Sequence, residues 1–86
     1  MKTVKDRKYS FNHTKQRIKE RYNRDVSREW YDNMCNRITN SHDGWSVLDI
    51  DGTQLIIELE LQFTDNIIVV WSDEKKCITT ALKDWR

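Results

Sequence analysis

The chain has 86 residues, of which 37% are hydrophobic and 34% charged, and its formal net charge is +1. This length predicts a single domain over residues 1–86, and the interleaving of charged and apolar positions argues against disorder. No apolar run approaches the roughly 20 residues that span a bilayer, and no apolar segment follows the charged N-terminus. We therefore expect no membrane insertion, no signal peptide and a cytoplasmic location.

The net charge hides an asymmetry between the two halves of the chain. Residues 1–40 hold eleven Lys/Arg and five Asp/Glu, a net of +6, whereas residues 41–86 hold four and nine, a net of −5, which together give +1. A basic half that includes helices is typical of phosphate binding. The alternative is that the two halves complement each other or solvate two faces of the domain.

The first predicted element is a helix that begins at a cap at Ser10 or Asn12 and ends at about Asn23. Its apolar positions recur with helical spacing. They are Phe11, Ile18 and Tyr22, with Thr14 or Lys15 filling the gap. Ser27 predicts the N-cap of a second helix, in which Glu29 suits the positive end of the helix dipole. The expected buried stripe of this helix is Trp30, Tyr31, Met34, Cys35 and Ile38.

After a loop over residues 39–44 the apolar period changes from 3.6 to 2, which indicates strands. The expected strands are Trp45–Ile50, Leu55–Phe63, Ile67–Trp71 and Cys77–Leu82, with turns at Asp51-Gly52, residues 64–66 and residues 72–76. The third strand is apolar throughout, as expected for a central strand covered on both faces. Short connections favour a meander, so the sequence predicts an α+β fold with two N-terminal helices packed on a four-stranded antiparallel sheet.

The sequence predicts no metal site and no cofactor. Cys35 and Cys77 are 42 residues apart and lack the partners of a zinc pattern, so we expect buried free thiols. His42 lies in a polar loop, where we expect it to be exposed and without a role. We find no glycine-rich phosphate loop and no nucleophile elbow.

His13, Arg17 and Arg21 recur at four-residue intervals and therefore share one ridge of the first helix. An imidazole can accept or donate a proton near neutral pH, and a guanidinium can bind a phosphate and stabilise developing charge. This combination suits phosphodiester chemistry. The alternative interpretation is a solvated basic helix face that carries an ordinary histidine.

The segment Tyr-Ser-Phe-Asn-His-Thr-Lys-Gln-Arg-Ile-Lys-Glu-Arg at residues 9–21 resembles the opening H-x-x-x-R-[IM]-x-E-R of a small domain family of unknown function. Those domains occur in bacteria and mobile elements and are related to RelE-type toxins. The resemblance continues through the helix opened by Val26-Ser27 and the strands at residues 68–71 and 77–82. It implies the barnase/colicin/RelE-like architecture and the activity of a metal-independent ribonuclease.

Carried over by position, the resemblance makes His13 the acid–base group and Arg17 the phosphate-binding group. Thr80, or less securely Thr79, would supply a hydroxyl that orients the phosphate. Lys8, Lys15 and Arg21 are candidates for further phosphate contacts because of their charge, not because of a role carried over from the motif. The implied reaction is attack of a ribose 2′-hydroxyl on the adjacent phosphate of RNA, and the second acid–base role is left to a Lys, Tyr9 or a non-protein group.

A second hypothesis is a non-catalytic accessory protein of a phage or mobile element that binds a host protein or nucleic acid. Glu58 and Glu60 on the outer face of a strand would then present a negative surface to a basic partner. A cognate inhibitor is a further expected partner of a toxin, and an open sheet edge could dimerise. The aromatic residues are expected to pack in the core, apart from Trp85, which could stack on RNA, dock on a partner or pack back onto the sheet.

Overall fold

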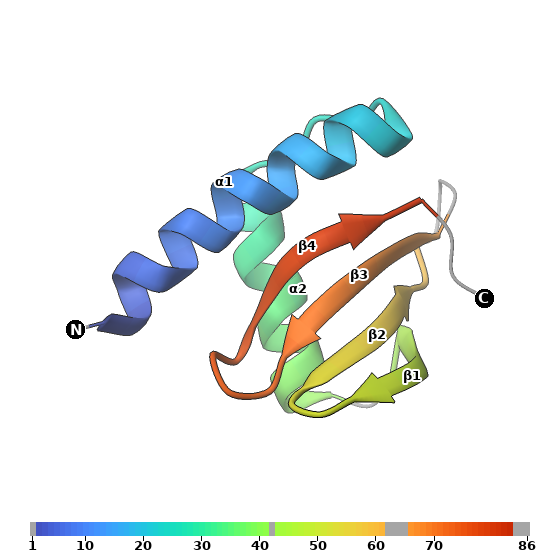
Figure 1. The fold of residues 1–86 in the computed structure, drawn as a ribbon. Coiled ribbons are helices and arrows are strands. Elements are labelled where there is room, and N and C mark those ends of the chain that lie inside the picture. Colours follow the sequence, from blue (N-terminus) through green and yellow to red (C-terminus); the bar gives the residue numbers. More distant parts are fainter. Residues whose placement is uncertain (1, 42, 62–65, 84–86) are drawn as a thin grey trace.

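The computed structural model describes residues 2–41, 43–61 and 66–83, with side chains from residue 8 onwards. Its elements are α1 (Lys2–Tyr22), α2 (Arg28–Asn40), β1 (Trp45–Asp51), β2 (Gln54–Leu59), β3 (Ile67–Ser72) and β4 (Cys77–Leu82). The four strands form one antiparallel sheet in the order β1-β2-β3-β4 (Figure 1). The predicted α+β class, the element order and the meander are confirmed.

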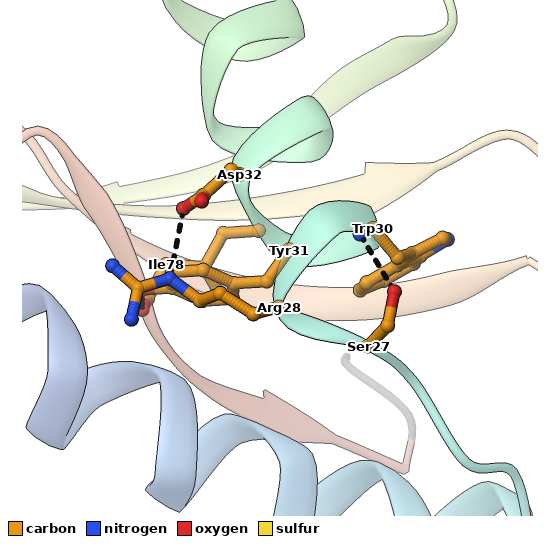
Figure 2. A network of polar contacts seen from close by, with 6 residues as sticks. All are labelled: Ser27, Arg28, Trp30, Tyr31, Asp32 and Ile78. Atoms are coloured by element: carbon orange, nitrogen blue, oxygen red, sulfur yellow. Dashed lines mark hydrogen bonds and ion pairs between the residues drawn. The ribbon is translucent and has the colours of Figure 1, made fainter.

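Helix α2 begins where the sequence predicts. The Ser27 hydroxyl accepts a hydrogen bond from the backbone N–H of Trp30 at 3.0 Å, which satisfies one of the unpaired donors of the first turn (Figure 2). Its buried residues are Tyr31, Met34, Cys35 and Ile38. The helix ends at Asn40, two residues later than predicted, and lies behind the sheet in Figure 1.

Helix α1 begins eight residues earlier than the predicted cap at Ser10, so that prediction was wrong. Ser10 lies in the middle of the helix and is 2% exposed, and His13 is therefore not near a helix terminus. The helix ends as predicted, because Asn23 adopts a φ of +55° and its N–H donates to the carbonyl of Lys19 at 3.0 Å. A left-handed Asn after the last turn is a common helix terminator.

Helix α1 packs along β4, the edge strand at residues 77–82 (Figure 1). Its buried side chains there are Ser10, Thr14 and Ile18. The Thr14 hydroxyl and the Tyr31 hydroxyl both donate to the backbone carbonyl of Ile78, and the Tyr22 hydroxyl donates to that of Leu82. Side chains of the two helices thus satisfy carbonyls of an edge strand that would otherwise be available to another chain.

The strands differ from prediction mainly at their ends. β2 stops at Leu59, so Glu60 follows the strand, and residues 62–65, which were expected to extend it and to turn, lie outside the described residues. The turn between β1 and β2 is confirmed, with Gly52 at a φ of +64°, as a type II′ hairpin requires at its first central position.

One sheet face forms the core with the helices. Leu55, Ile57 and Leu59 of β2 alternate onto that face, whereas Ile56 points to the opposite face and is nevertheless 6% exposed. Both cysteines are free thiols in the described structure and are buried, as predicted. The fully or nearly buried core cluster also includes Val26, Tyr31, Met34, Ile38, Ile67, Val69, Trp71, Ile78 and Ala81.

Candidate functional site

His13 and Arg17 lie on the flank of α1 that faces away from α2. Thr14, between them, points at β4, and Phe11 on the other flank contacts the Tyr31 ring of α2 edge-on at 5.4 Å between centroids. Because successive residues turn by about 100°, His13 and Arg17 fall on the opposite side of Thr14 from Phe11. Both side chains are half-buried.

Thr80 lies on the sheet face that points away from α2. It pairs across the sheet with Val70, which pairs with Ile56, and this row belongs to the face opposite α2. Thr79 is the extra residue of a β-bulge, and its hydroxyl donates to the Val70 carbonyl at 3.2 Å. The Thr79 hydroxyl is therefore already used within the sheet, which favours Thr80 of the two candidate hydroxyls.

Tyr9 was expected to pack in the core, and that prediction was wrong. Its side chain is 72% exposed, and its ring stacks against the imidazole of His13 with centroids 6.4 Å apart and planes inclined by 13°. Because α1 extends to Lys2, Tyr9 occupies the turn before His13 on the same ridge. A predicted helix that included residue 9 would have placed Tyr9 one turn before His13. The predicted cap at Ser10 instead put Tyr9 outside the helix.

Arg17 is held by its own helix. Its guanidinium Nη1 lies 2.7 Å from Oε1 of Glu20, and the other Glu20 oxygen accepts from Gln16 at 3.1 Å. The hydrogen bond from Arg17, then that from Gln16, lowers the pKa of the Glu20 carboxyl below its usual range. The ion pair thereby fixes the position of the Arg17 guanidinium, but a bound phosphate would have to compete with the Glu20 carboxylate for it.

The other basic candidates are divided between two flanks. Arg21 continues the ridge one turn beyond Arg17 and is exposed. Around the axis of α1, Lys15 is rotated by about 200° from His13, and Lys8 by about 140°. Both lysines therefore point away from the flank that carries His13. Lys8 and Lys15 are exposed but are not brought together with His13.

Glu58 and Glu60 lie at the other side of the sheet, beside β1. Glu58 is half-buried and pairs with Ser46, while Glu60 is exposed and accepts a hydrogen bond from the Ser46 hydroxyl at 3.2 Å. Glu60 also lines an open cavity of about 710 Å³ together with Arg37 and Asp43. A Cβ on Gly44 would lie 3.0 Å from Arg37 Nη1, so this glycine makes room for the guanidinium.

The sequence did not indicate this cavity, because it is assembled from the end of α2, the following loop and the end of β2. His13, Arg17 and Thr80 line neither this cavity nor a smaller one of about 230 Å³ beside Trp45 and Trp71. His42 and Trp85 lie outside the described residues. Within the described part of the chain, no group of three or more His, Cys, Asp or Glu side chains is placed to hold a metal ion.

No protein-family model matches the chain, and searches of curated proteins and of solved structures also return no match. What is shown for this chain is therefore the fold alone, two helices and a four-stranded antiparallel sheet. None of the described helices is both long enough and apolar enough to cross a membrane.

Proposed function

We propose that the chain binds RNA through the ridge of α1 formed by Tyr9, His13, Arg17 and Arg21, hereafter the α1 ridge. The observation that carries the proposal is the exposed Tyr9 ring stacked beside His13 on a strongly basic helix. Residues 2–22 contain eight Lys/Arg and two Asp/Glu, a net of +6. Exposed aromatic rings next to cations are the usual platform for unpaired bases and their phosphates.

The shape of the surface agrees with a single-stranded ligand. The residues of the α1 ridge line neither of the two cavities described above, and Tyr9 and Arg21 are exposed. A strand laid along the helix would stack a base on Tyr9 and place its phosphates near Arg17 and Arg21. Such binding weakens with salt, because each phosphate contact releases condensed counterions.

The resemblance to RelE-type toxin relatives extends this proposal to cleavage without a metal ion. His13 would take the proton of a ribose 2′-hydroxyl as its oxygen bonds to phosphorus. The bond from phosphorus to the 5′-oxygen would break, leaving a 2′,3′-cyclic phosphate. Tyr9, the neighbour of His13, is the group on the α1 ridge best placed to return a proton to the 5′-oxygen. Arg17 would offset the added negative charge, and Thr80 would hydrogen-bond the phosphate.

The test measures binding and cleavage separately, with single-stranded RNA in excess EDTA. We expect Arg17→Ala to weaken binding about tenfold, and Tyr9→Ala by a similar factor because a stacked base is lost. Lys75→Ala removes the same charge from the turn between β3 and β4, so it should change affinity much less. Equal losses in Arg17→Ala and Lys75→Ala would show only non-specific attraction and would contradict the proposal.

Two further variants test whether His13 is catalytic and whether the ion pair with Glu20 limits the binding of RNA by Arg17. Cleavage by the wild type that His13→Gln abolishes, with cyclic-phosphate ends and unchanged affinity, would establish the ribonuclease. If the wild type binds RNA and the RNA stays intact, the protein is an RNA-binding protein without ribonuclease activity. Glu20→Gln frees Arg17 from its ion pair, and we expect it to bind RNA more tightly than the wild type.

A further inference from the structure

β1 is the open edge of the sheet, at the opposite side from the α1 ridge. Its six residues after Trp45 are all exposed, including three large apolar side chains: Val47 at 44%, Leu48 at 40% and Ile50 at 66%. Among the described residues, the order β1-β2-β3-β4 leaves one side of β1 without a neighbouring strand. An edge strand of this kind is a template for a further strand.

The side chains of β1 sort by face. Val47 and Ile50 pair with Ile57 and Leu55, whose side chains enter the core, so they belong to the α2 side. The cross-strand partners of Asp49 and Asp51 are Ile56 and Gln54, on the opposite side. Leu48 is the extra residue of a bulge between these sets. A strand added here would meet apolar side chains on one face and carboxylates on the other.

The segment that contains β1 is rich in carboxylates, although Arg37 and Lys76 line the cavities beside Gly44 and Trp45. Between Arg37 and Lys75 the sequence contains no Lys or Arg but eight Asp/Glu: residues 43, 49, 51, 58, 60, 65, 73 and 74. Two of these carboxylates, Glu58 and Glu60, are adjacent to Ser46 of β1. Neighbouring strands lie about 4.8 Å apart, so a Lys or Arg on an added strand would meet Asp49 directly and Glu58 one strand further.

We infer that β1 binds an extended segment of a partner protein in which Lys or Arg alternates with apolar residues, and that this segment pairs with β1 as a fifth strand. Its apolar side chains would cover Val47 and Ile50, and its cations would face Asp49 and Asp51. This role is independent of the α1 ridge, since the sheet separates the two surfaces (Figure 1).

A second copy of the chain is a poorer occupant. Antiparallel pairing of two β1 strands would gather Asp49 and Asp51 of both copies on one face, and like charges across a strand pair are destabilising. The basic residues of the N-terminal half that could neutralise them lie mainly in α1, which is helical and is occupied with β4.

The edge is also partly protected, which makes pairing selective. The backbone N–H of Ile50 donates to Oδ1 of Asp49 at 2.8 Å, and the bulge at Leu48 interrupts the regular ladder. Aspartates and bulges at edges discourage indiscriminate pairing. A cationic partner that draws the Asp49 carboxylate to itself would release this N–H for the new ladder.

The experiment uses labelled ten-residue peptides with blocked termini and the full chain. One peptide alternates Lys and Val, a second has the same composition as a block of Lys followed by a block of Val, and a third alternates Glu and Val. We expect the alternating Lys/Val peptide to bind most tightly by fluorescence anisotropy. Its amide shifts in NMR should be centred on residues 46–50.

Charge variants locate the contact. The double variant Asp49→Asn with Asp51→Asn should weaken binding of the alternating Lys/Val peptide by on the order of tenfold, since each exposed ion pair contributes a few-fold to affinity. The control, Asp25→Asn with Glu29→Gln, removes the same charge from exposed positions far from β1 in the sequence and should have a much smaller effect. Val47→Thr keeps the β-branched shape while removing an apolar contact, and should also weaken binding.

Three outcomes would overturn the inference. Equal binding of the alternating and block peptides would mean that attraction is purely electrostatic. Shift changes centred on α1 would place the peptide elsewhere. Concentration-dependent dimerisation in sedimentation, abolished by Ile50→Lys, would make a second copy the occupant of β1. RNA bound to the α1 ridge should not displace the peptide, so failure here and failure of RNA binding are distinguishable.

Discussion

The two edge strands of the sheet, β4 and β1, face opposite environments. At β4 the carbonyls of Ile78 and Leu82 accept hydrogen bonds from Thr14, Tyr31 and Tyr22, and α1 covers the strand (Figure 1). At β1 no helix covers the strand in the described structure, and apolar side chains remain exposed. Both strands present the same backbone groups, so the difference comes from side chains supplied by distant segments.

The comparison shows how 86 residues can separate two kinds of surface. Small residues at positions 10 and 14 let α1 approach β4 closely, which places its basic ridge along one side of the molecule. Asp49, Asp51, Glu58 and Glu60 lie on the other side, in β1 and at β2. The nearly neutral total charge therefore results from two opposed surfaces, each with its own class of expected partner.

The largest expected difference between the two edges concerns buried apolar volume. Ile18→Ala removes a fully buried side chain between α1 and the core, and we expect a loss of about 2–5 kcal/mol in the free energy of unfolding. Ile50→Ala on β1 removes a side chain that is 66% exposed and should cost at most about 0.5 kcal/mol. Urea denaturation of both variants measures this contrast, and comparable losses would mean that β1 is covered in solution.

The sequence predicted the parts of this architecture that depend on local signals. Ser27 indicated the start of α2 because its hydroxyl accepts a hydrogen bond from a backbone N–H in the first turn of the helix. Asp51-Gly52 indicated a turn because glycine readily adopts the positive φ that this turn needs. Ser10 misled because a small polar residue can cap a helix or pack closely inside one. Only the partner surface, here β4, distinguishes the two.

The site was predicted in part for the same reason. The spacing of His13 and Arg17 placed them on one ridge, but the stacking of Tyr9 on His13 depended on where α1 begins. The sequence predicted a strand over residues 45–50 but not which of its side chains are buried; the bulge at Leu48 and the edge position of β1 decide that Val47 and Ile50 share a face and are exposed. These are long-range properties that one sequence does not contain as local patterns.

A smaller effect tests whether hydroxyl groups hold the β4 edge. Tyr31→Phe deletes the hydroxyl that donates to Ile78 from a fully buried ring, and leaves that carbonyl to Thr14 alone. We expect a loss of about 1–3 kcal/mol in stability, because a buried acceptor loses a partner. Ser46→Ala removes an exposed hydroxyl at the β1 edge and should cost under about 0.5 kcal/mol. Faster amide exchange in β4 than in β1 of the wild type would contradict this account.

The smallest expected effect appears only at alkaline pH and comes from the same tyrosine. Burial, and then the neighbouring thiols of Cys35 and Cys77, raise the pKa of Tyr31 well above its usual value. The unfolded chain ionises this phenol at about pH 10, whereas the folded chain keeps it neutral. Its contribution is therefore complete below about pH 10 and declines as pH rises, by no more than about 1.4 kcal/mol per pH unit.

Comparison with Tyr31→Phe isolates that contribution, since the two proteins differ in no other ionisable group. The stability difference between wild type and Tyr31→Phe should be constant from pH 7 to pH 9 and should shrink between pH 10 and pH 11.5. A difference that stays constant up to pH 11.5 would show that the Tyr31 phenol ionises as easily in the folded chain as in the unfolded one. Water would then reach the Tyr31 hydroxyl at the middle of β4. The two edge strands would both be accessible to water and would differ only in extent.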